Sequence, residues 1–454
     1  MGIRKLFAAK DMTQGAPWQR ILEFSIPMLL GNIAQQLYNT ADSVIVGIFV
    51  GDNALAAVGS AMPILNLLLA LFVGIATGAG IVISQAYGAR DREGLSKSIG
   101  NCITLAFIAT LVIMALGPLL TSPMLKLLGT PDSILGWCSS YLIIQFLGIA
   151  GFFFYNMLSG VLRGLGDSVS ALGFLLLAAG LNVVLDLVFV AGFGLGVAGV
   201  SLATVIAQGI SAYFCFRKLM KMGSIFDLNK STVKLDQAVA MRIIRLGVPS
   251  GITQAIFSMA SMVTQSLTNS MGEMVIAANV IIMRVDGFAM MPNMTFGQAM
   301  SVYTGQNVGA GKLDRVHQGT KQGLIMNVAI SAAITVIILI FGPFLFDLFT
   351  DTPETIAIGA RYLWCIMPFY PFLASMFCIN NSMRGAGDSM FPMICILLSQ
   401  IFVRVPVFYY FADTFGPYNM YYTYGVTWAF GAALAVCYFL TGRWKRFSLT
   451  KKEE

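Results

Sequence analysis

Long apolar runs recur from one end of the chain to the other, separated by short polar segments. A helix that crosses the hydrocarbon core of a bilayer needs about 20 mostly apolar residues. The pattern therefore predicts an all-α integral membrane protein with twelve transmembrane helices. We expect them at residues 20–47, 55–85, 98–120, 134–161, 169–191, 197–219, 243–269, 275–302, 321–349, 356–383, 392–412 and 421–442.

Short motifs occur twice in this pattern, and the two copies are 221 or 222 residues apart. Arg163-Gly-Leu-Gly-Asp-Ser returns as Arg384-Gly-Ala-Gly-Asp-Ser, and the polar ends of the second and eighth spans match in the same way. We infer two homologous six-helix lobes. The N-lobe is predicted at residues 1–220, a cytoplasmic linker at 221–242 and the C-lobe at 243–454.

Six spans per lobe is an even number, so both lobes enter the membrane from the same side. This predicts a pseudo-twofold axis along the membrane normal, an arrangement found in transporters that hold substrate between two repeats. The repeat therefore favours transport as the function.

The charge distribution changes what the composition suggests. The chain carries a net charge of +7 and is 57% hydrophobic. With twelve spans and a cytoplasmic N-terminus, most Lys and Arg residues fall in cytoplasmic segments, and only Lys126 and Arg361 fall outside. This follows the positive-inside rule and predicts a multi-pass protein of the plasma membrane, in a bacterium the cytoplasmic membrane, with both termini in the cytoplasm. The basic excess needs no nucleic-acid partner.

The first span contains a carboxylate, Asp42, in the stretch Gly31-Asn-Ile-Ala-Gln-Gln-Leu-Tyr-Asn-Thr-Ala-Asp-Ser. An ionised side chain inside a bilayer costs several kcal/mol, so it marks a candidate functional site. Gln35, Tyr38 and Asp42 fall on one helical face, with Asn39 beside them. We expect that face to line a cavity that admits substrate.

A second carboxylate, Asp186, follows Asn182 by one helical turn in the fifth span. Counting about 1.5 Å per residue places both at the depth of Asp42, together with Thr204 of the sixth span. Four oxygen-bearing side chains suit a proton or a hard monovalent cation such as sodium, for which the same four would be the metal ligands. Alternatively, Asp186 and Asn182 only satisfy each other at a helix interface.

The eighth span holds Arg284 and Asp286, two residues apart and therefore on roughly opposite faces. Arg284 is either a counter-charge in the cavity or a structural residue bonded to the backbone, since intramembrane arginines serve both roles. Arg404, beside a proline, is interpreted as structural.

The sequence contains few of the residue patterns that an enzyme would need. The seven cysteines show no paired or metal-ligand spacing, and His317 is the single histidine. Phosphate-binding glycine motifs after a strand are absent from the sequence, so we expect no cofactor, and the energy would come from a proton or sodium gradient. An integral-membrane enzyme is the distant alternative.

Taken together, these motifs resemble the multidrug and toxic compound extrusion (MATE) transporters over nearly the whole chain. The resemblance implies antiport of organic, often cationic and amphipathic compounds against protons or sodium, by a protein that works as a monomer in the bilayer. It also implies that Asp42, Asn182, Asp186 and Thr204 form the cation site. Gln35 and Asn156 would then lie near the substrate cavity, and Pro27 and Gly31 where the first helix bends.

The sequence departs from the sodium-coupled NorM-like branch, which has a Glu in span 7 and an Asp in span 10. Here Gln254 and the Asn380-Asn381 region carry no carboxylate. The chain is therefore more similar to the DinF-like branch, and proton coupling is preferred. A lipid-linked oligosaccharide flippase of the same superfamily is the nearest alternative, but it would require several cavity Arg or Lys residues, and only Arg284 is evident.

Overall fold

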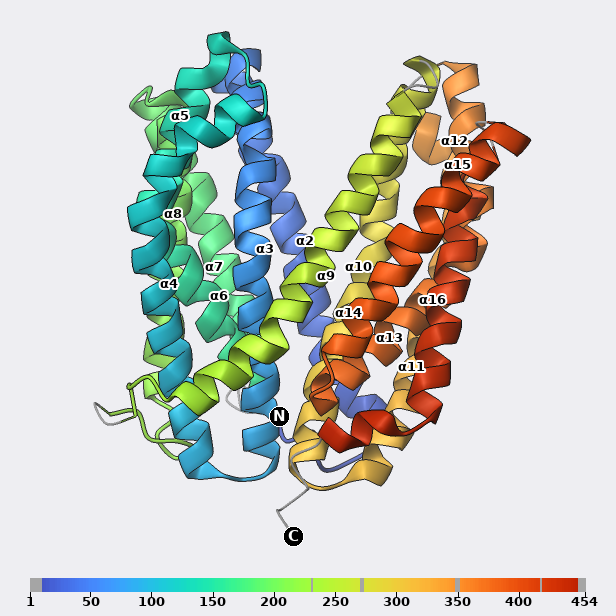
Figure 1. Ribbon diagram of the computed structural model, residues 1–454. Coiled ribbons are helices and arrows are strands. Elements are labelled where there is room, and N and C mark those ends of the chain that lie inside the picture. Colours follow the sequence, from blue (N-terminus) through green and yellow to red (C-terminus); the bar gives the residue numbers. More distant parts are fainter. Residues whose placement is uncertain (1–9, 230–231, 270–272, 348–351, 417–418, 448–454) are drawn as a thin grey trace. The chain divides into compact units, whose positions relative to one another are not determined.

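The computed structural model describes residues 10–447 apart from 230–231, 270–272, 348–351 and 417–418, and the described part is helical without strands. Figure 1 shows long helices joined by short connections. The helices of the first half are α2 (Pro17–Phe49), α3 (Asp52–Gly88), α4 (Arg92–Leu127), α5 (Asp132–Leu147), α6 (Ile149–Gly164), α7 (Ser168–Asp186), the π-helical turn η1 (Leu187–Gly192) and α8 (Gly196–Met220).

The second half repeats this order with more breaks. Its elements are α9 (Gln237–Asn269), α10 (Glu273–Gly309), α11 (Leu313–Asp347), α12 (Pro353–Ile366), the 3₁₀ turn η2 (Met367–Phe369), α13 (Tyr370–Ala386), α14 (Met390–Leu397), the π-helical turn η3 (Leu398–Val403), α15 (Arg404–Phe415), α16 (Tyr422–Leu440) and the 3₁₀ turn η4 (Arg443–Phe447).

Each predicted span has a helical counterpart, and the twelve-helix all-α prediction is confirmed. Within the described residues, nine helices are long and apolar enough to cross a membrane. The fourth span is α5 and α6, which bend by 52° at Gly148. A Cβ at Gly148 would lie 2.2 Å from Val205 of α8, so only glycine lets the bend approach that helix.

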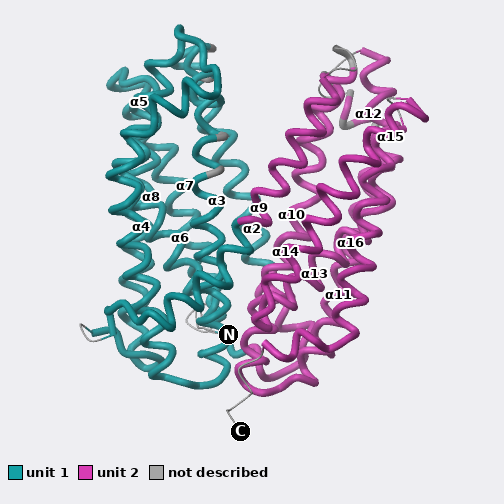
Figure 2. The backbone as a smooth tube through the Cα atoms, viewed as in Figure 1, with its two compact units in different colours: residues 1–11, 26–251 teal, residues 12–25, 252–454 magenta. Residues whose placement is uncertain are grey.

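The chain forms two compact units whose boundaries differ from the predicted lobes (Figure 2). Unit 1 contains the residues up to Asp11 and Ile26–Gly251, and unit 2 contains Met12–Ser25 and the residues from Ile252 onward. The predicted limits followed chain order. In the structure, the segment that opens each half packs within the unit formed mainly by the other half.

The repeated glutamines Gln85 and Gln306 explain this exchange. In unit 1 the Arg242 guanidinium donates to Gln85 Oε1 at 2.6 Å, and in unit 2 the Met12 amide donates to Gln306 Oε1 at 2.8 Å. Both glutamines are fully buried, and a buried amide is costly without a partner. Each glutamine therefore holds the segment that enters its unit from the opposite half.

Close helix packing reinforces this exchange in unit 1. Gly74 and Gly78 of α3 face Gly247 and Gly251 of α9, and a Cβ at Gly74 would lie 2.3 Å from the Gly251 backbone nitrogen. Two small-xxx-small patterns thus let the two backbones touch. A larger side chain at Gly74 or Gly247 would push α9 off unit 1.

The repeated Arg-Gly-x-Gly-Asp-Ser motif is a turn between helices. Its second glycine has positive φ in both copies, 85° at Gly166 and 106° at Gly387, which glycine adopts without strain. The following aspartate then caps the next helix. Asp167 accepts from the Ser170 amide at 2.9 Å, and Asp388 from the Phe391 amide at 3.2 Å.

The connection between α8 and α9 is anchored to unit 1. Arg92 donates to both carboxylate oxygens of Asp227 at 2.8 Å and to the carbonyl oxygens of Gly223 and Ser224. Helix α9 begins at Gln237, inside the predicted linker 221–242. The bonds from Arg92 hold residues 223–227 against the start of α4.

Candidate ion and substrate site

Unit 1 brings the four predicted ion-site residues together from three helices. Asp42 lies on α2, Asn182 and Asp186 on α7, and Thr204 on α8. Their exposed fractions are 8%, 1%, 0% and 9%, so the site is buried although every member is polar. Helix α2 also approaches α7 closely at Gly31, where a Cβ would lie 3.3 Å from the Leu175 side chain.

Asn182 joins two of these residues through its amide. In the orientation that matches donors to acceptors, its nitrogen donates to Asp186 Oδ2 at 2.9 Å. Its oxygen then accepts from the Thr204 hydroxyl and from the Thr204 amide, both at 3.2 Å. One oxygen of Asp186 thus has a hydrogen-bond partner in the protein. Because Asn182 is itself bonded to Thr204 of α8, it fixes the orientation of the Asp186 carboxyl group.

The carboxyl groups of Asp42 and Asp186 are within hydrogen-bonding reach of each other. Asp42 Oδ1 and Asp186 Oδ1 are both buried, and neither has a hydrogen-bond partner among the residues that the structure describes. Two carboxylates so close in a low dielectric repel strongly, so an added proton or cation between them would be stabilised. The pair therefore has the chemistry of a cation or proton acceptor.

The backbone changes form directly after Asp186, where α7 passes into η1. Single π-helical turns occur frequently at functional sites, because the extra residue frees a backbone carbonyl from its usual helical partner. The sequence of this turn, Leu-Val-Phe-Val-Ala-Gly, gave no signal for it.

Two tyrosines surround the carboxyl pair. Tyr38 of α2 lies close enough to interact with the Thr204 side chain and with Asp42, so this predicted cavity residue lies beside the carboxyl pair. Tyr141 of α5 is 3% exposed and interacts with the charge of Asp42 and with the Gln145 side chain. Sequence reasoning missed Tyr141, although a tyrosine in the middle of an apolar span was an available signal.

The other predicted cavity residues lie away from these hydrogen bonds. Gln35 and Asn39 are exposed on α2. Asn156 of α6 is half-buried, and its amide donates to the Phe152 carbonyl of its own helix. Arg284 is exposed on α10 and belongs to unit 2. Each of these roles remains a prediction.

The predicted hinge lies inside a continuous helix. Pro27 is an internal residue of α2, and the chain passes from unit 2 to unit 1 between Ser25 and Ile26. Pro249 of α9 has the matching place, two residues before the chain leaves unit 1. A helical proline lacks the N–H that would bond the carbonyl one turn earlier, which weakens the helix there.

Unit 2 contains a second buried polar cluster, which the sequence reasoning only half recognised. The Tyr370 hydroxyl donates to the Asp286 carboxylate. Arg404, 5% exposed, donates to Gln400 Oε1 at 3.1 Å and lies 4.1 Å from the centre of the Tyr424 ring. Asp286 is within electrostatic reach of Arg404, so Arg404 belongs to a charged cluster and is more than a packing residue.

Solved structures of membrane transporters share the fold of this chain. A solved structure described as MATE in the straight conformation matches with a TM-score of 0.87 at 25% identity, covering 98% of this chain and 99% of that one. A MOP superfamily transporter from Pyrococcus furiosus, described as having a binding pocket of reverse polarity, matches with the same score and identity over 98% of each chain. The fold is that of a multi-pass membrane transporter.

The family follows from the sequence comparisons. A family model described as MatE matches twice, at residues 27–188 and 249–410, once in each half. The probable multidrug resistance protein YpnP of Bacillus subtilis is 31% identical over 442 residues, 97% of this chain and 99% of the relative. The multidrug export protein MepA of Staphylococcus haemolyticus is 22% identical over 93% of this chain and 92% of the relative. The chain belongs to the MatE family and is a transporter, not an enzyme.

Proposed function

We propose that this MATE transporter exports organic, amphipathic and often cationic compounds in exchange for protons, and that Asp42 and Asp186 carry the exchange. The observation that supports the proposal is the pair of buried carboxyl groups, each with an oxygen that accepts no hydrogen bond from the described residues. Sodium is the alternative ion, because these two free ligand atoms are carboxylate oxygens, which hard cations prefer.

The chain's own residues define how the pair responds to a proton. When both carboxyl groups are ionised, the buried site holds two negative charges, which favour a cationic substrate. A proton held between Asp42 and Asp186 removes half of that charge, while Asn182 keeps Asp186 in place. Proton and substrate therefore favour different charge states of one unit, and this differential affinity is the requirement for coupling.

The energy available matches this requirement. One proton moving inward through about 100 mV gains about 2.3 kcal/mol. A coupling free energy between two ligands is about 1–3 kcal/mol. One proton per cycle therefore supplies enough free energy to release a substrate held by the charge of the pair.

Movement of α2 would link the charge state to access. The helix spans both units and contains Pro27 and Gly31. Solved structures described as MATE in bent and straight conformations share this fold, with TM-scores of 0.88 and 0.87. We propose that protonation of the carboxyl pair changes the bend of α2 near Pro27, so that substrate on the α2 face is released. In this proposal the protein acts as a monomer in the cytoplasmic membrane with both termini inside the cell.

The test is transport in proteoliposomes that contain the purified protein and a fluorescent organic cation. We expect uptake or release to follow an imposed pH gradient, and to persist without sodium. Asp42→Asn and Asp186→Asn should abolish the dependence on the gradient, whereas Asp132→Asn, an exposed aspartate at the start of α5, should leave it intact. Sodium-driven transport insensitive to a protonophore would reject proton coupling, and wild-type transport by Asp42→Asn would reject the assigned site.

A further inference from the structure

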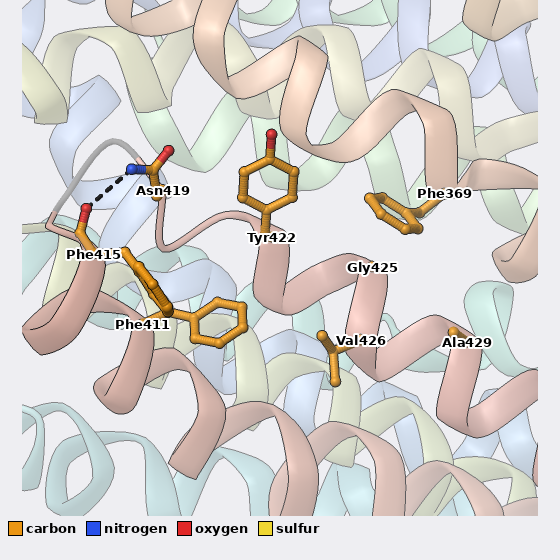
Figure 3. A pocket seen from close by; sticks show the side chains of 8 residues that line it. All are labelled: Phe369, Phe411, Phe415, Asn419, Tyr422, Gly425, Val426 and Ala429. Carbon is orange, nitrogen blue, oxygen red and sulfur yellow. Dashed lines mark hydrogen bonds between the residues drawn. The ribbon is translucent and has the colours of Figure 1, made fainter.

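An aromatic pocket in unit 2 has no part in the transport proposal. It has a volume of about 500 Å³ and is lined by Phe369, Phe411, Phe415, Asn419, Tyr422, Gly425, Val426 and Ala429. Figure 3 shows these side chains on three segments, with Asn419 at one end and Ala429 at the other. The accessible lining of the pocket is almost entirely apolar, and Asn419, the one lining residue with an amide side chain, lies at one end.

The shape of the pocket follows the surface of α16. Tyr422, Gly425, Val426 and Ala429 recur at intervals of three and four, so they form one face of the helix. At 1.5 Å per residue this face is about 10 Å long. Gly425 lets the Phe369 ring pack directly against α16, because a Cβ at this position would lie 2.6 Å from the ring. The result is an elongated slot suited to a chain-like apolar group.

A cationic side chain, that of Arg361, lies outside the slot next to Asn419. Arg361 of α12 donates to Asn419 Oδ1 at 2.9 Å, and Asn419 in turn donates to the Phe415 carbonyl at 3.0 Å. Arg361 also interacts electrostatically with Tyr422, so its charge lies beside the slot. In the described part of the chain no carboxylate forms an ion pair with Arg361. Its remaining N–H groups therefore suit an anionic oxygen.

The neighbouring surface places this end at the membrane interface. Trp364 lies one turn after Arg361 on α12 and is 61% exposed. Exposed tryptophan and tyrosine gather at the level of lipid headgroups, and arginine side chains reach toward the same level. The slot therefore begins at headgroup depth and continues along α16.

We propose that this slot binds a membrane glycerophospholipid, with the phosphate at Arg361 and one acyl chain along Tyr422, Val426 and Ala429. The charge separates this occupant from a transported cation, which Arg361 would repel. Because an acyl chain in the bilayer is already out of water, its contribution comes from packing against the aromatic side chains of the slot, and the charge-assisted bonds to phosphate fix which end faces the interface.

The experiment is native mass spectrometry of the full-length protein, purified free of lipid and titrated with phosphatidylglycerol. We expect one tightly bound lipid per wild-type chain. Val426→Trp, which fills the slot from a position 41% exposed, should lose it, whereas Val336→Trp, on an exposed face of α11, should keep it. Arg361→Gln should weaken binding about tenfold, and Arg361→Lys should bind nearly as well as the wild type.

Two further ligands distinguish recognition of the phosphate from nonspecific hydrophobic binding. A diacylglycerol with the same chains but no phosphate should bind about as weakly as phosphatidylglycerol binds Arg361→Gln, and the organic cation tetraphenylphosphonium should not displace the lipid. Equal binding by Val426→Trp and Val336→Trp would overturn the proposal, and so would displacement by the cation, which would assign the slot to substrate. Neither outcome bears on Asp42, because these measurements need no ion gradient.

Discussion

The fifth helical pass of each half carries an amide side chain one turn before a charged side chain, but the charge has opposite sign in the two units. In unit 1 Asn182 donates to Asp186, and in unit 2 Arg404 donates to Gln400. Each pair adjoins a π-helical turn, η1 after Asp186 and η3 before Arg404. Both units therefore have an amide and a charged side chain beside a π-helical turn. They differ in the sign of the charge, which is negative in unit 1 and positive in unit 2.

That difference determines whether a unit can change its charge. Unit 1 sets a second carboxyl group, Asp42, close to Asp186, and neither forms an ion pair with a Lys or Arg in the described part of the chain. In unit 2 the cation is part of the chain, because Arg404 stacks on Tyr424 and the Asp286 carboxylate is held by Tyr370. An arginine stays charged in proteins, whereas a carboxyl pair can take up and lose a proton. We therefore expect coupling to reside in unit 1.

The largest expected effect tests this assignment directly. Asp42→Asn should reduce gradient-driven export by about 5- to 150-fold, the range that corresponds to a coupling free energy of 1–3 kcal/mol. Asp286→Asn should reduce it far less, because its charge is not exchanged. Export assays on both variants in the same proteoliposomes provide the measurement. A larger loss with Asp286→Asn would reverse the roles of the two units.

Arg404→Met should mainly destabilise unit 2. It removes the bond to Gln400, the contact with the Tyr424 ring and the counter-charge of Asp286, together about 2–4 kcal/mol. Thermal unfolding in detergent would show this as a lowered Tm. The gradient dependence of the remaining folded protein should be unchanged, and loss of coupling without loss of stability would show that Arg404 participates in transport.

A pair of tyrosine variants compares single hydrogen bonds. Tyr370→Phe removes a bond to a carboxylate, and such bonds contribute about 1.5–3 kcal/mol. Tyr38→Phe removes a weaker interaction between two neutral groups, with the Thr204 side chain, for which at most about 0.5–1.5 kcal/mol is expected. The Tm of Tyr370→Phe should therefore fall further. Equal shifts would indicate that Asp286 is not ionised beside Tyr370.

The exposed pair Arg92 and Asp227 should give the smallest effect. The hydrogen bonds and charge of Arg92 hold the pKa of Asp227 below its usual range. The pair is therefore fully formed above pH 4, the ordinary range of carboxyl groups, and weakens as the pH falls through the lower folded value. Hydrogen exchange at residues 223–229, corrected for the intrinsic pH dependence, should rise there in the wild type. Asp227→Asn should show no such step.

The sequence could not reveal the reversed charge through the repeat. Asn182 and Gln400, like Asp186 and Arg404, are 218 residues apart, whereas the motifs that established the repeat are 221 apart. An offset of 221 pairs Asp186 with Val407, so the repeat does not align the two charged residues. The repeat therefore gives no reason to interpret Arg404 as anything but structural.

The amino-acid sequence by itself determined the spans, the two halves and the grouping of Asp42, Asn182, Asp186 and Thr204, because hydropathy, helical period and depth are local properties that add up along a helix. Its link to the DinF-like branch remains a prediction. Tertiary structure alone decided which unit holds Met12–Ser25, which partners Gln85 and Gln306 receive, and that Tyr370 meets Asp286. These contacts join residues 84 to 294 positions apart, and they depend on how whole helices pack, which no local pattern encodes.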